Sequence, residues 1–533
     1  MSLINTNFKK SLLFGVLPLI LIVLNLLDPQ TAGKIAIYSL FCAWFFLNLI
    51  SYLSYKISQN SKFNSQIKIL KHFFVILFFV LVISILFFIS FEVALRVIFG
   101  VHQDSYNVMS AIFGTDLAET SEFIGQYARY LIIFSILFIL GCAFYIFVFS
   151  KTQPHNKKAI VIVLGLIFVF IHINPTMRKI NTFFYFYKSY SEFVSSSNEL
   201  ANLKDEISSN LQSLNSVKFT DEPNTFVLVI GESDTRYNWH LYGYGRDTTP
   251  QMDMIKDELL IFKNATAAAP NTIAAFINIM TNANKNNPNA YKTSPDILLL
   301  AKLGGYKTYF ISNHSTDNRS IINVFASNAD ELILTNIGHS RGEGSFDEAV
   351  IEPYEKALKD NAKKKFIIVH LLGSHPAYHF RYPKEFSKYT YEFGDEVATK
   401  LSNEGRAKYA IAFRNLYDNS ILYSDFIRTK LLVRLMESKG ERKSWLYFSD
   451  HGQDVSHNSN FSGHNYKSKE QWDVPMVFWS NDYKRLNFQN ELDENLSIKF
   501  DTRQIDLANI NHTILGLLNI SGDYYDEKLD IFK

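Results

Sequence analysis

The chain has 533 residues, of which 47% are hydrophobic, and a formal net charge of +2. A charge this close to neutral gives no reason to expect a nucleic-acid partner. The two cysteines, Cys42 and Cys142, both lie in apolar segments of the first third of the sequence. The remaining two thirds therefore contain no disulfide, no thiol nucleophile and no cysteine-ligated metal.

The first third contains five long apolar segments with few charges. They are Leu12–Leu27, Ile35–Tyr55, Phe73–Val97, Leu131–Ser150 and Ala159–Ile173. At 1.5 Å per residue, most of them are long enough to cross the hydrocarbon core of a membrane. We therefore expect a transmembrane domain of five helices in residues 1–174. No small-residue cleavage site follows the first segment, which favours an uncleaved anchor over a signal peptide.

Loop charges predict the orientation of these helices. Lysines gather in alternate loops, at Lys9, Lys10, Lys56, Lys62, Lys68, Lys71, Lys151, Lys157 and Lys158. Residues 102–127 instead carry four acidic residues and no Lys or Arg. The lysine-rich side is the cytoplasmic side. An odd number of spans then places the chain after Ile173 on the opposite side of the membrane.

Residues 175–221 are expected to form a linker. Its first part, Thr182–Lys188, is rich in aromatic residues that favour a membrane interface. Its second part, Ser195–Leu214, has leucine and isoleucine at helical spacing. We interpret this part as an amphipathic connector rather than a substrate sensor.

Residues 222–533 alternate between strand-like and helix-like segments. The expected strands are Thr225–Ile230, Lys307–Ser312, Phe366–Leu371, Trp445–Phe448 and Pro475–Trp479. The expected helices are Asp296–Leu303, Asp347–Leu358, Glu404–Ser438 and Leu507–Leu517, the last with Asp506 as its N-cap. This alternation predicts an α/β fold with parallel strands and right-handed crossovers, arranged as a three-layer α/β/α sandwich.

Three of these strands end at residues that bind metals. Glu232 follows the first, His375 follows the third, and Asp450 and His451 follow the fourth. In open α/β sheets, ligands bind at the carboxyl ends of strands. A mixed set of carboxylate and imidazole side chains suits zinc better than magnesium or calcium. Each residue alone is more typical of a helix cap or a structural histidine, but together they indicate a metal site.

Thr272 is a candidate nucleophile. It precedes the helix-like segment Ile273–Thr281, so backbone N–H groups and the helix dipole attract an anion there. A threonine hydroxyl is a poor nucleophile unless a metal ion or a base activates it. The alternative is that Asn271 or Thr272 is only the N-cap of this helix.

Several segments resemble the lipopolysaccharide phosphoethanolamine transferases, which are membrane members of the alkaline phosphatase and sulfatase superfamily. They are Gly231–Pro250, Ala269–Thr272, His370–Tyr378 with Arg381–Pro383, Tyr417–Asp425, Ser449–Gly452 and Val474–Pro475. The resemblance extends over nearly the whole chain. It implies a multi-pass protein of the bacterial inner membrane whose catalytic domain, of alkaline phosphatase or sulfatase type, lies in the periplasm.

The resemblance also implies roles for individual residues. The zinc ligands of the family match Glu232, Thr272, Asp450 and His451, and Thr272 is also the nucleophile. The matches to its further site histidines are His375 and His464, which would bind the transferred phosphate, a second metal, or the leaving and entering oxygens. One or two zinc ions are thus expected. His240 lies in the signature but follows a surface-like turn, which favours a structural role.

The sequence departs from the family in two respects. Many members that modify lipid A have disulfides in the outer domain, and this chain has none there, which makes it more similar to the branch acting on core sugars. The family's donor-headgroup pattern is matched by Thr115 and Glu119, but Ala111 replaces the usual Asn. A solvated loop helix is an equal alternative for Thr115 and Glu119.

The expected reaction has two steps. Thr272 attacks the phosphorus of phosphatidylethanolamine and releases diacylglycerol. The phosphoethanolamine then passes to a lipopolysaccharide acceptor, with His375 or His464 as general acid or base. The alternatives are a phosphoglycerol transferase using phosphatidylglycerol, a periplasmic phosphatase or sulfatase, and a transporter or sensor that only binds ligand. A monomer is expected.

Overall fold

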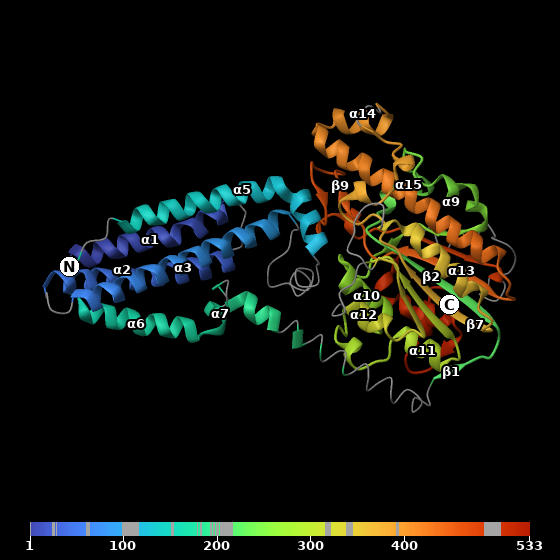
Figure 1. The fold of residues 1–533 in the computed structure, drawn as a ribbon, viewed down its shortest axis with the longest axis horizontal. Helices are drawn as coiled ribbons and strands as arrows, with labels where there is room; N and C mark the ends of the chain where they lie inside the picture. Colours follow the sequence, from blue (N-terminus) through green and yellow to red (C-terminus); the bar gives the residue numbers. More distant parts are fainter. Residues whose placement is uncertain are drawn as a thin grey trace. The chain divides into compact units, whose positions relative to one another are not determined.

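The computed structural model describes residues 2–23, 27, 29–59, 64–98, 117–150, 154–178, 180–181, 184–191, 194–195, 198, 202, 217–314, 321–336, 345–390, 394–483 and 503–533. The chain forms two compact units (Figure 1). One comprises residues 1–109 and 127–194, and the other comprises residues 110–126 and 195–533. We call them the helical unit and the α/β unit, and describe each by itself.

The described part of the helical unit is built from long apolar helices. They are α1 (Ser2–Val23), α2 (Pro29–Gln59), α3 (Asn64–Ile98), α5 (Leu117–Ser150, which belongs to this unit from Tyr127 onward) and α6 (Lys158–Ile173), followed by the short α7 (Pro175–Arg178). Among the residues described, three helical segments are long and apolar enough to cross a membrane: 29–59, 65–96 and 127–147. The α6 helix is apolar but shorter. The count of five spans therefore stays a prediction.

The α/β unit is organised around a seven-stranded sheet with the order β3-β11-β8-β2-β7-β5-β6. Its strands are β2 (Asn224–Gly231), β3 (Leu260–Phe262), β5 (Lys307–Ser312), β6 (Glu331–Leu334), β7 (Lys364–His370), β8 (Lys443–Ser449) and β11 (Met476–Ser480). Every residue of the central strand β2 is buried. An apolar strand of this kind is typical of a parallel sheet covered on both faces.

Most of the sheet is parallel, as predicted, but one predicted strand is not. β2, β5, β6, β7 and β8 run parallel to one another, whereas β11 is antiparallel to both β8 and β3. Parallel neighbours need a crossover connection, usually a helix. Residues 450–475, all of them described, form no α-helix between β8 and β11. The sheet is therefore mixed, and the expectation that all strands are parallel was wrong for Pro475–Trp479.

Helices cover both faces of this sheet (Figure 1). One face packs on α10 (Thr272–Met280), α11 (Ile297–Leu303), α12 (Ile321–Ala326) and α17 (Ile510–Leu517). The other packs on α9 (Pro250–Met254), α13 (Ile351–Lys359) and α15 (Lys408–Glu437), with α14 (Glu396–Asn403) beside α15. The side chains of β2 alternate between the two apolar cores. This is the predicted three-layer arrangement.

Short strand pairs complete the α/β unit. They are β1 (Lys218–Phe219) with β13 (Ile520–Ser521), β4 (Ala265–Thr266) with β12 (Ile505–Asp506), and β9 (Asp454–Val455) with β10 (Ser462–Gly463). Asp506 accepts a hydrogen bond from the backbone N–H of Ala508 and is the N-cap that the sequence predicts. Most of the predicted connector Ser195–Leu214 lies outside the described residues.

Candidate functional site

The carboxyl ends of four adjacent parallel strands carry the polar residues of one buried cluster. β8, β2, β7 and β5 are neighbours in the sheet. Register aligns Gly231 of β2 with Ser449 of β8, and Ile230 with His370 of β7. Glu232 and Asp450 therefore leave the sheet side by side, and both are almost fully buried. The strand-end argument from the sequence thus describes the real geometry of this edge.

Thr272 reaches this cluster from the first turn of α10. The side chain of Asn271 caps the helix by accepting the N–H of Ala274 at 3.0 Å, so Asn271 is the N-cap and Thr272 the first helical residue. The Thr272 hydroxyl donates to Glu232 Oε2 at 3.1 Å and lies 3.3 Å from His451 Nε2. Because the cap is Asn271, the hydroxyl of Thr272 is directed to the strand ends instead of to the helix backbone.

The spacing of this group fits a metal ion. His451 Nε2 lies 3.4 Å from Glu232 Oε1 and 3.5 Å from Asp450 Oδ2. These separations are long for hydrogen bonds. Ligand atoms around a tetrahedral zinc ion with bonds of about 2.1 Å are roughly 3.4 Å apart. Glu232, Asp450 and His451 could therefore hold one cation, with the Thr272 oxygen beside them.

Unsatisfied polar atoms point to the same conclusion. Asp450 Oδ1 accepts the backbone N–H groups of His451 and Ser233, but the buried Oδ2 has no hydrogen-bond partner among the described residues. His451 Nδ1 lies 3.0 Å from the carbonyl oxygen of Gly452, which leaves Nε2 as the ligand atom. A buried carboxylate oxygen without a partner is costly, and a cation would satisfy it.

Electrostatics within the cluster are dominated by burial and by the two carboxylates. Burial and the neighbouring Glu232 carboxylate raise the pKa of Asp450 well above its usual range. Burial by itself would raise the pKa of Glu232. The neighbouring imidazoles of His451 and His314 have the opposite and larger effect, so the pKa of Glu232 is held well below its usual range. Two adjacent carboxylates are stable together when a proton or a cation lies between them.

Backbone geometry holds Glu232 in place. Ser233 has a positive φ of 64°, and its hydroxyl donates to Glu232 Oε1 at 2.7 Å. Gly373 has a φ of 52°, and a Cβ there would lie 2.7 Å from the carbonyl oxygen of Glu232. A left-handed residue other than glycine costs about 1–2 kcal/mol. This strain at Ser233 positions the carboxylate.

Two histidines that the sequence analysis did not select complete the buried cluster. His314 Nε2 lies 3.5 Å from Glu232 Oε2, and its ring stacks on that of His370, with centroids 4.2 Å apart. Both rings are buried. His314 lies two residues beyond β5, and His370 is the last residue of β7. The rule that selected Glu232 applies equally to the ends of these two strands and could have found both.

The predicted histidines His375 and His464 lie on opposite sides of the cluster. The His375 ring is 5.9 Å from that of His314, and the His464 ring is 4.9 Å from that of His451. Burial, with His451 nearby, lowers the pKa of His464 to about 3. Both histidines are partly exposed. They are positioned to meet a group that enters from solvent.

The sequence also singled out Thr115, Glu119 and His240. Thr115 lies outside the described residues, and of Glu119 only its place in α5 is described. His240 is exposed, and its Nδ1 lies 2.6 Å from Asp253 Oδ2.

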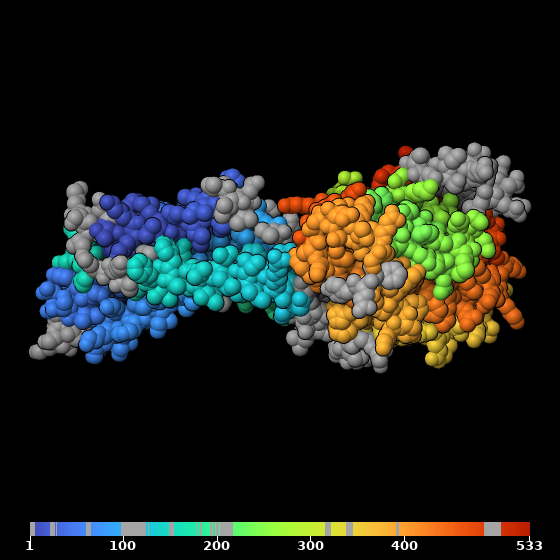
Figure 2. All heavy atoms as spheres, turned by 90° about the horizontal axis from the view of Figure 1, so that it is seen from above, coloured from blue at the N-terminus to red at the C-terminus, as the bar shows by residue number. Residues whose placement is uncertain are grey.

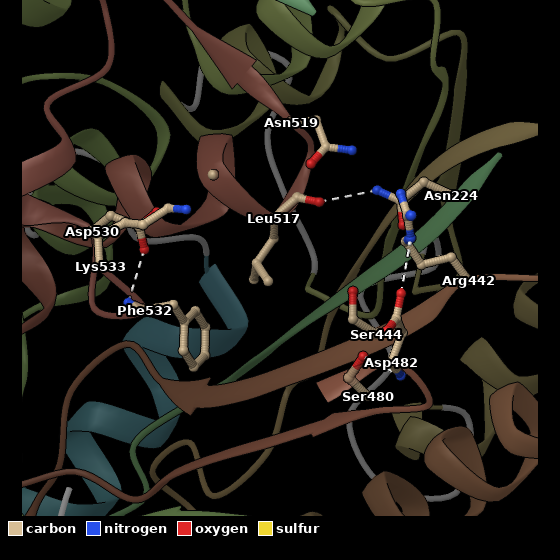
Figure 3. A pocket seen from close by; sticks show the side chains of 11 residues that line it. Asn224, Arg442, Ser444, Ser480, Asp482, Leu517, Asn519, Asp530, Phe532 and Lys533 are labelled. Atoms are coloured by element: carbon tan, nitrogen blue, oxygen red, sulfur yellow. Dashed lines mark hydrogen bonds and ion pairs between the residues drawn. The ribbon is translucent and has the colours of Figure 1, made fainter. Parts of the chain in front are cut away.

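A polar pocket of about 60 Å³ lies at the opposite, amino-terminal edge of the sheet (Figure 3). There Asn224, the first residue of β2, donates to the carbonyl oxygen of Leu517, and Arg442 pairs with Asp482. Eight residues of strand at ~3.3 Å each separate Asn224 from Glu232. The pocket is therefore remote from the buried cluster.

The sequence and the fold are similar to those of known proteins. A sequence model described as Sulfatase matches residues 224–520. The chain is 28% identical over 463 residues to phosphoethanolamine transferase EptC of Escherichia coli O18:K1:H7. The match covers 81% of this chain and 78% of that protein.

Two solved structures are similar to the chain. The C-terminal periplasmic domain of EptC from Escherichia coli, in complex with Zn, is 31% identical, with a TM-score of 0.54 and coverage of 60% of this chain and 88% of that one. The integral membrane protein lipooligosaccharide phosphoethanolamine transferase A from Neisseria meningitidis is 18% identical, with a TM-score of 0.63 and coverage of 99% and 98%. The second likeness concerns the fold alone, and it includes the helical unit.

Proposed function

The chain belongs to the sulfatase family, and from that premise we propose that it transfers phosphoethanolamine from phosphatidylethanolamine to lipopolysaccharide. The observation that carries this proposal is the position of Thr272: its hydroxyl lies 3.1 Å from Glu232 and 3.3 Å from His451 at the N-terminus of α10. The similarity to phosphoethanolamine transferase EptC supports the choice of transferred group.

In the first step, Thr272 Oγ1 attacks the phosphorus of the lipid. The new bond joins Oγ1 to phosphorus, and the bond from phosphorus to the glycerol oxygen breaks. Diacylglycerol leaves with a proton, and phosphoethanolamine remains on Thr272. The proton that diacylglycerol carries balances the one that the Thr272 hydroxyl loses. Glu232 Oε2 accepts the hydrogen bond of this hydroxyl and orients it for attack.

In the second step, an acceptor oxygen attacks the same phosphorus and releases Thr272. His464 is neutral near pH 7 because its pKa is lowered to about 3. It can therefore accept a hydrogen bond from the acceptor hydroxyl, whose proton ends on Thr272 Oγ1 as the bond from that oxygen to phosphorus breaks, while His375 lies on the far side of the cluster. The free N–H groups in the first turn of α10 face the charge that develops on the phosphoryl oxygens.

Glu232, Asp450 and His451 would hold a zinc ion beside Thr272. When bound, the ion supplies a Lewis acid that lowers the pKa of the hydroxyl and offsets negative charge on the phosphoryl group. The choice of zinc rests on the mixed donor set and on the Zn complex of the similar EptC domain.

The predicted transmembrane domain, residues 1–174, would hold the lipid donor. We propose that it spans the bacterial inner membrane five times, that residues 222–533 form the catalytic domain in the periplasm, and that residues 175–221 link the two. Thr115 and Glu119 are proposed contacts of the donor headgroup. A monomer contains every residue of this scheme. The lack of cysteine outside Cys42 and Cys142 favours a core-sugar acceptor over lipid A.

The decisive experiment follows the phosphoethanolamine group on the full chain in detergent. With phosphatidylethanolamine alone, intact-protein and peptide mass spectrometry should find phosphoethanolamine on Thr272, with diacylglycerol as the second product. Thr272→Ala should lower transfer to lipopolysaccharide by at least about 10⁴-fold, as expected for loss of a nucleophile. Thr272→Ser, the matched control, keeps the hydroxyl and should keep measurable transfer.

Other results would identify the alternative functions. Modification by phosphatidylglycerol instead of phosphatidylethanolamine would indicate a phosphoglycerol transferase. Release of free phosphoethanolamine with no labelled acceptor would indicate a hydrolase that uses water. If Thr272→Ala retains full transfer while its circular dichroism is unchanged, the nucleophile is another residue.

A further inference from the structure

A second group of metal-binding side chains lies against the first, on the β5 and β7 side of Glu232. It consists of Glu232, His314 and His370, whose ligand atoms lie within 4.8 Å of one another. All three residues are buried, with relative exposures of 1%, 6% and 0%. Two imidazoles and one carboxylate are the donor set of open zinc sites, in which a fourth position is left to an oxygen ligand.

The ring nitrogens that face this group lack partners. His314 Nε2 and His370 Nε2 are both buried without a hydrogen-bond partner among the described residues. The other ring nitrogen of His370 is satisfied, since Nδ1 lies 3.1 Å from the hydroxyl of Ser312. When Nδ1–H donates to this hydroxyl, Nε2 carries the lone pair that binds metals.

From this geometry we propose that the chain binds a second zinc-type divalent cation through Glu232, His314 and His370. The 3.5 Å separation of His314 Nε2 and Glu232 Oε2 is close to the roughly 3.4 Å between ligands of one tetrahedral ion. All ligand atoms of the group lie within 4.8 Å of one another, so no pair needs to move by more than about 1.4 Å to reach that value. The face-to-face stacking of the two rings leaves their edges free to turn toward the carboxylate.

Glu232 would be shared between the two ions. Its Oε1 is near His451 Nε2, at 3.4 Å, and its Oε2 is near His314 Nε2, at 3.5 Å. A carboxylate that bridges two ions places them roughly 3.5–4 Å apart, a distance at which both can contact one phosphoryl group. The second ion would thus lie on the side of His314 and His370, and not between His375 and His464.

The inference rests on the proposed function only through Glu232. Counting the zinc ions bound per chain tests the second site independently of the proposed transfer reaction. The full chain is saturated with Zn²⁺ in detergent, passed through a desalting column and analysed for metal per chain. All proteins carry His240→Asn, because His240, Asp247 and Asp253 form a largely exposed group that could also hold a cation and so add to the count. Asn is the chosen replacement at the other histidines because its side chain retains a polar atom near Nδ1 and removes Nε2.

The expected counts differ between the two pairs of histidines. The parent protein should hold two zinc ions, His314→Asn and His370→Asn should each hold one, and His375→Asn and His464→Asn should still hold two. Cobalt substitution gives a second readout, because the visible spectrum should lose the bands of one ion in the first pair only. Transfer activity plays no part in this count, so an inactive but doubly loaded protein would contradict only the proposed function.

Three outcomes overturn the inference: a parent protein with one ion, unchanged counts in the His314 and His370 variants, or a loss that occurs instead at His375 or His464. If His370→Asn does not fold, His314→Asn decides alone, because His314 lies beyond the end of β5, whereas His370 is part of β7.

Discussion

The helical unit exposes large apolar side chains, whereas the α/β unit buries charged ones. In the helical unit, Phe170 is 72% exposed and Leu166 is 67% exposed, and α5 forms an uncovered surface (Figure 2). In the α/β unit, Arg428 and Asp418 have no exposed surface, and Asp234 has 1%. Exposed apolar surface on this scale is stable in hydrocarbon, and buried charge is stable only with partners.

This difference shows what each unit uses its residues for. The helical unit satisfies its backbone within helices and can present any apolar side chain to lipid. The α/β unit has two apolar cores, one on each face of the sheet, and these hold buried polar residues in fixed positions. The reactive group at Glu232 depends on that rigidity. Removal of a buried charge should therefore damage the α/β unit, whereas addition of a charge to an exposed apolar site should damage the helical unit.

The largest effect on stability is expected when one charge inside the α/β unit is left alone. Arg428 pairs with Asp234 at 3.0 Å and lies over the ring of Trp239 at 3.8 Å. Arg428→Met leaves a buried carboxylate without its cation and should cost about 3–5 kcal/mol in the free energy of unfolding. Urea denaturation of the full chain, followed by tryptophan fluorescence, measures this. The double variant Arg428→Met with Asp234→Asn should recover part of the loss, and failure to recover would show that the two charges are not coupled.

A pH-dependent effect of similar size is expected at Asp425. Burial raises its pKa to about 7, against an ordinary value of 3.8. The folded state therefore favours the neutral carboxyl more strongly than the unfolded state does. The stability that this difference contributes is complete below pH 3.8 and is lost as the pH rises toward 7 and above. Since one pKa unit corresponds to about 1.4 kcal/mol, Asp425→Asn should exceed the wild type by up to about 4 kcal/mol at pH 8 and equal it near pH 4. Denaturation midpoints at the two pH values test this, and a constant difference would refute it.

The reverse substitution, a charge added to an exposed site, should damage only the helical unit. Ile136 of α5 is 52% exposed and Met254 of α9 is 78% exposed. An Arg at the centre of a membrane helix costs about 2.5–3.5 kcal/mol. Ile136→Arg should therefore reduce the amount of protein in the membrane fraction, whereas Met254→Arg should stay within about 0.5 kcal/mol of the wild type. Equal recovery of both variants would mean that α5 does not face lipid.

The parts of the fold that could be predicted were those determined by the residues of a single segment. The run from Thr225 to Ile230 is apolar at every position, and it became the central strand. The direction of Pro475–Trp479 was missed because it depends on the connection that precedes it, which contains no helix. The sequence does show that absence, so an antiparallel strand was available as a prediction.

The site was predictable where strand ends carry the chemistry. Glu232, Asp450 and His451 follow directly from that argument, whereas Thr272 needed a helix start to be located as well. The strand-end rule could also have selected His314, but its distance from Glu232 could not be predicted, because that distance depends on the order of β2, β7 and β5 in the sheet. That order results from packing across the whole unit and not from any single segment.

A small loss of stability is expected when the cap of α10 is removed, and this change separates the positioning of Thr272 from the stability of the unit. Asn271 caps α10, which begins with Thr272. Asp296 caps α11 in the same way but is not one of the candidate site residues, so it serves as the control. Loss of either cap should cost about 1 kcal/mol. Only Asn271→Ala should also lower kcat, because it frees the turn that directs the Thr272 hydroxyl to Glu232. Asn271→Ser should restore both properties. A fall in kcat of the same size in Asp296→Ala would show that the loss reflects general destabilisation, and the precise start of α10 would then have no special part in catalysis.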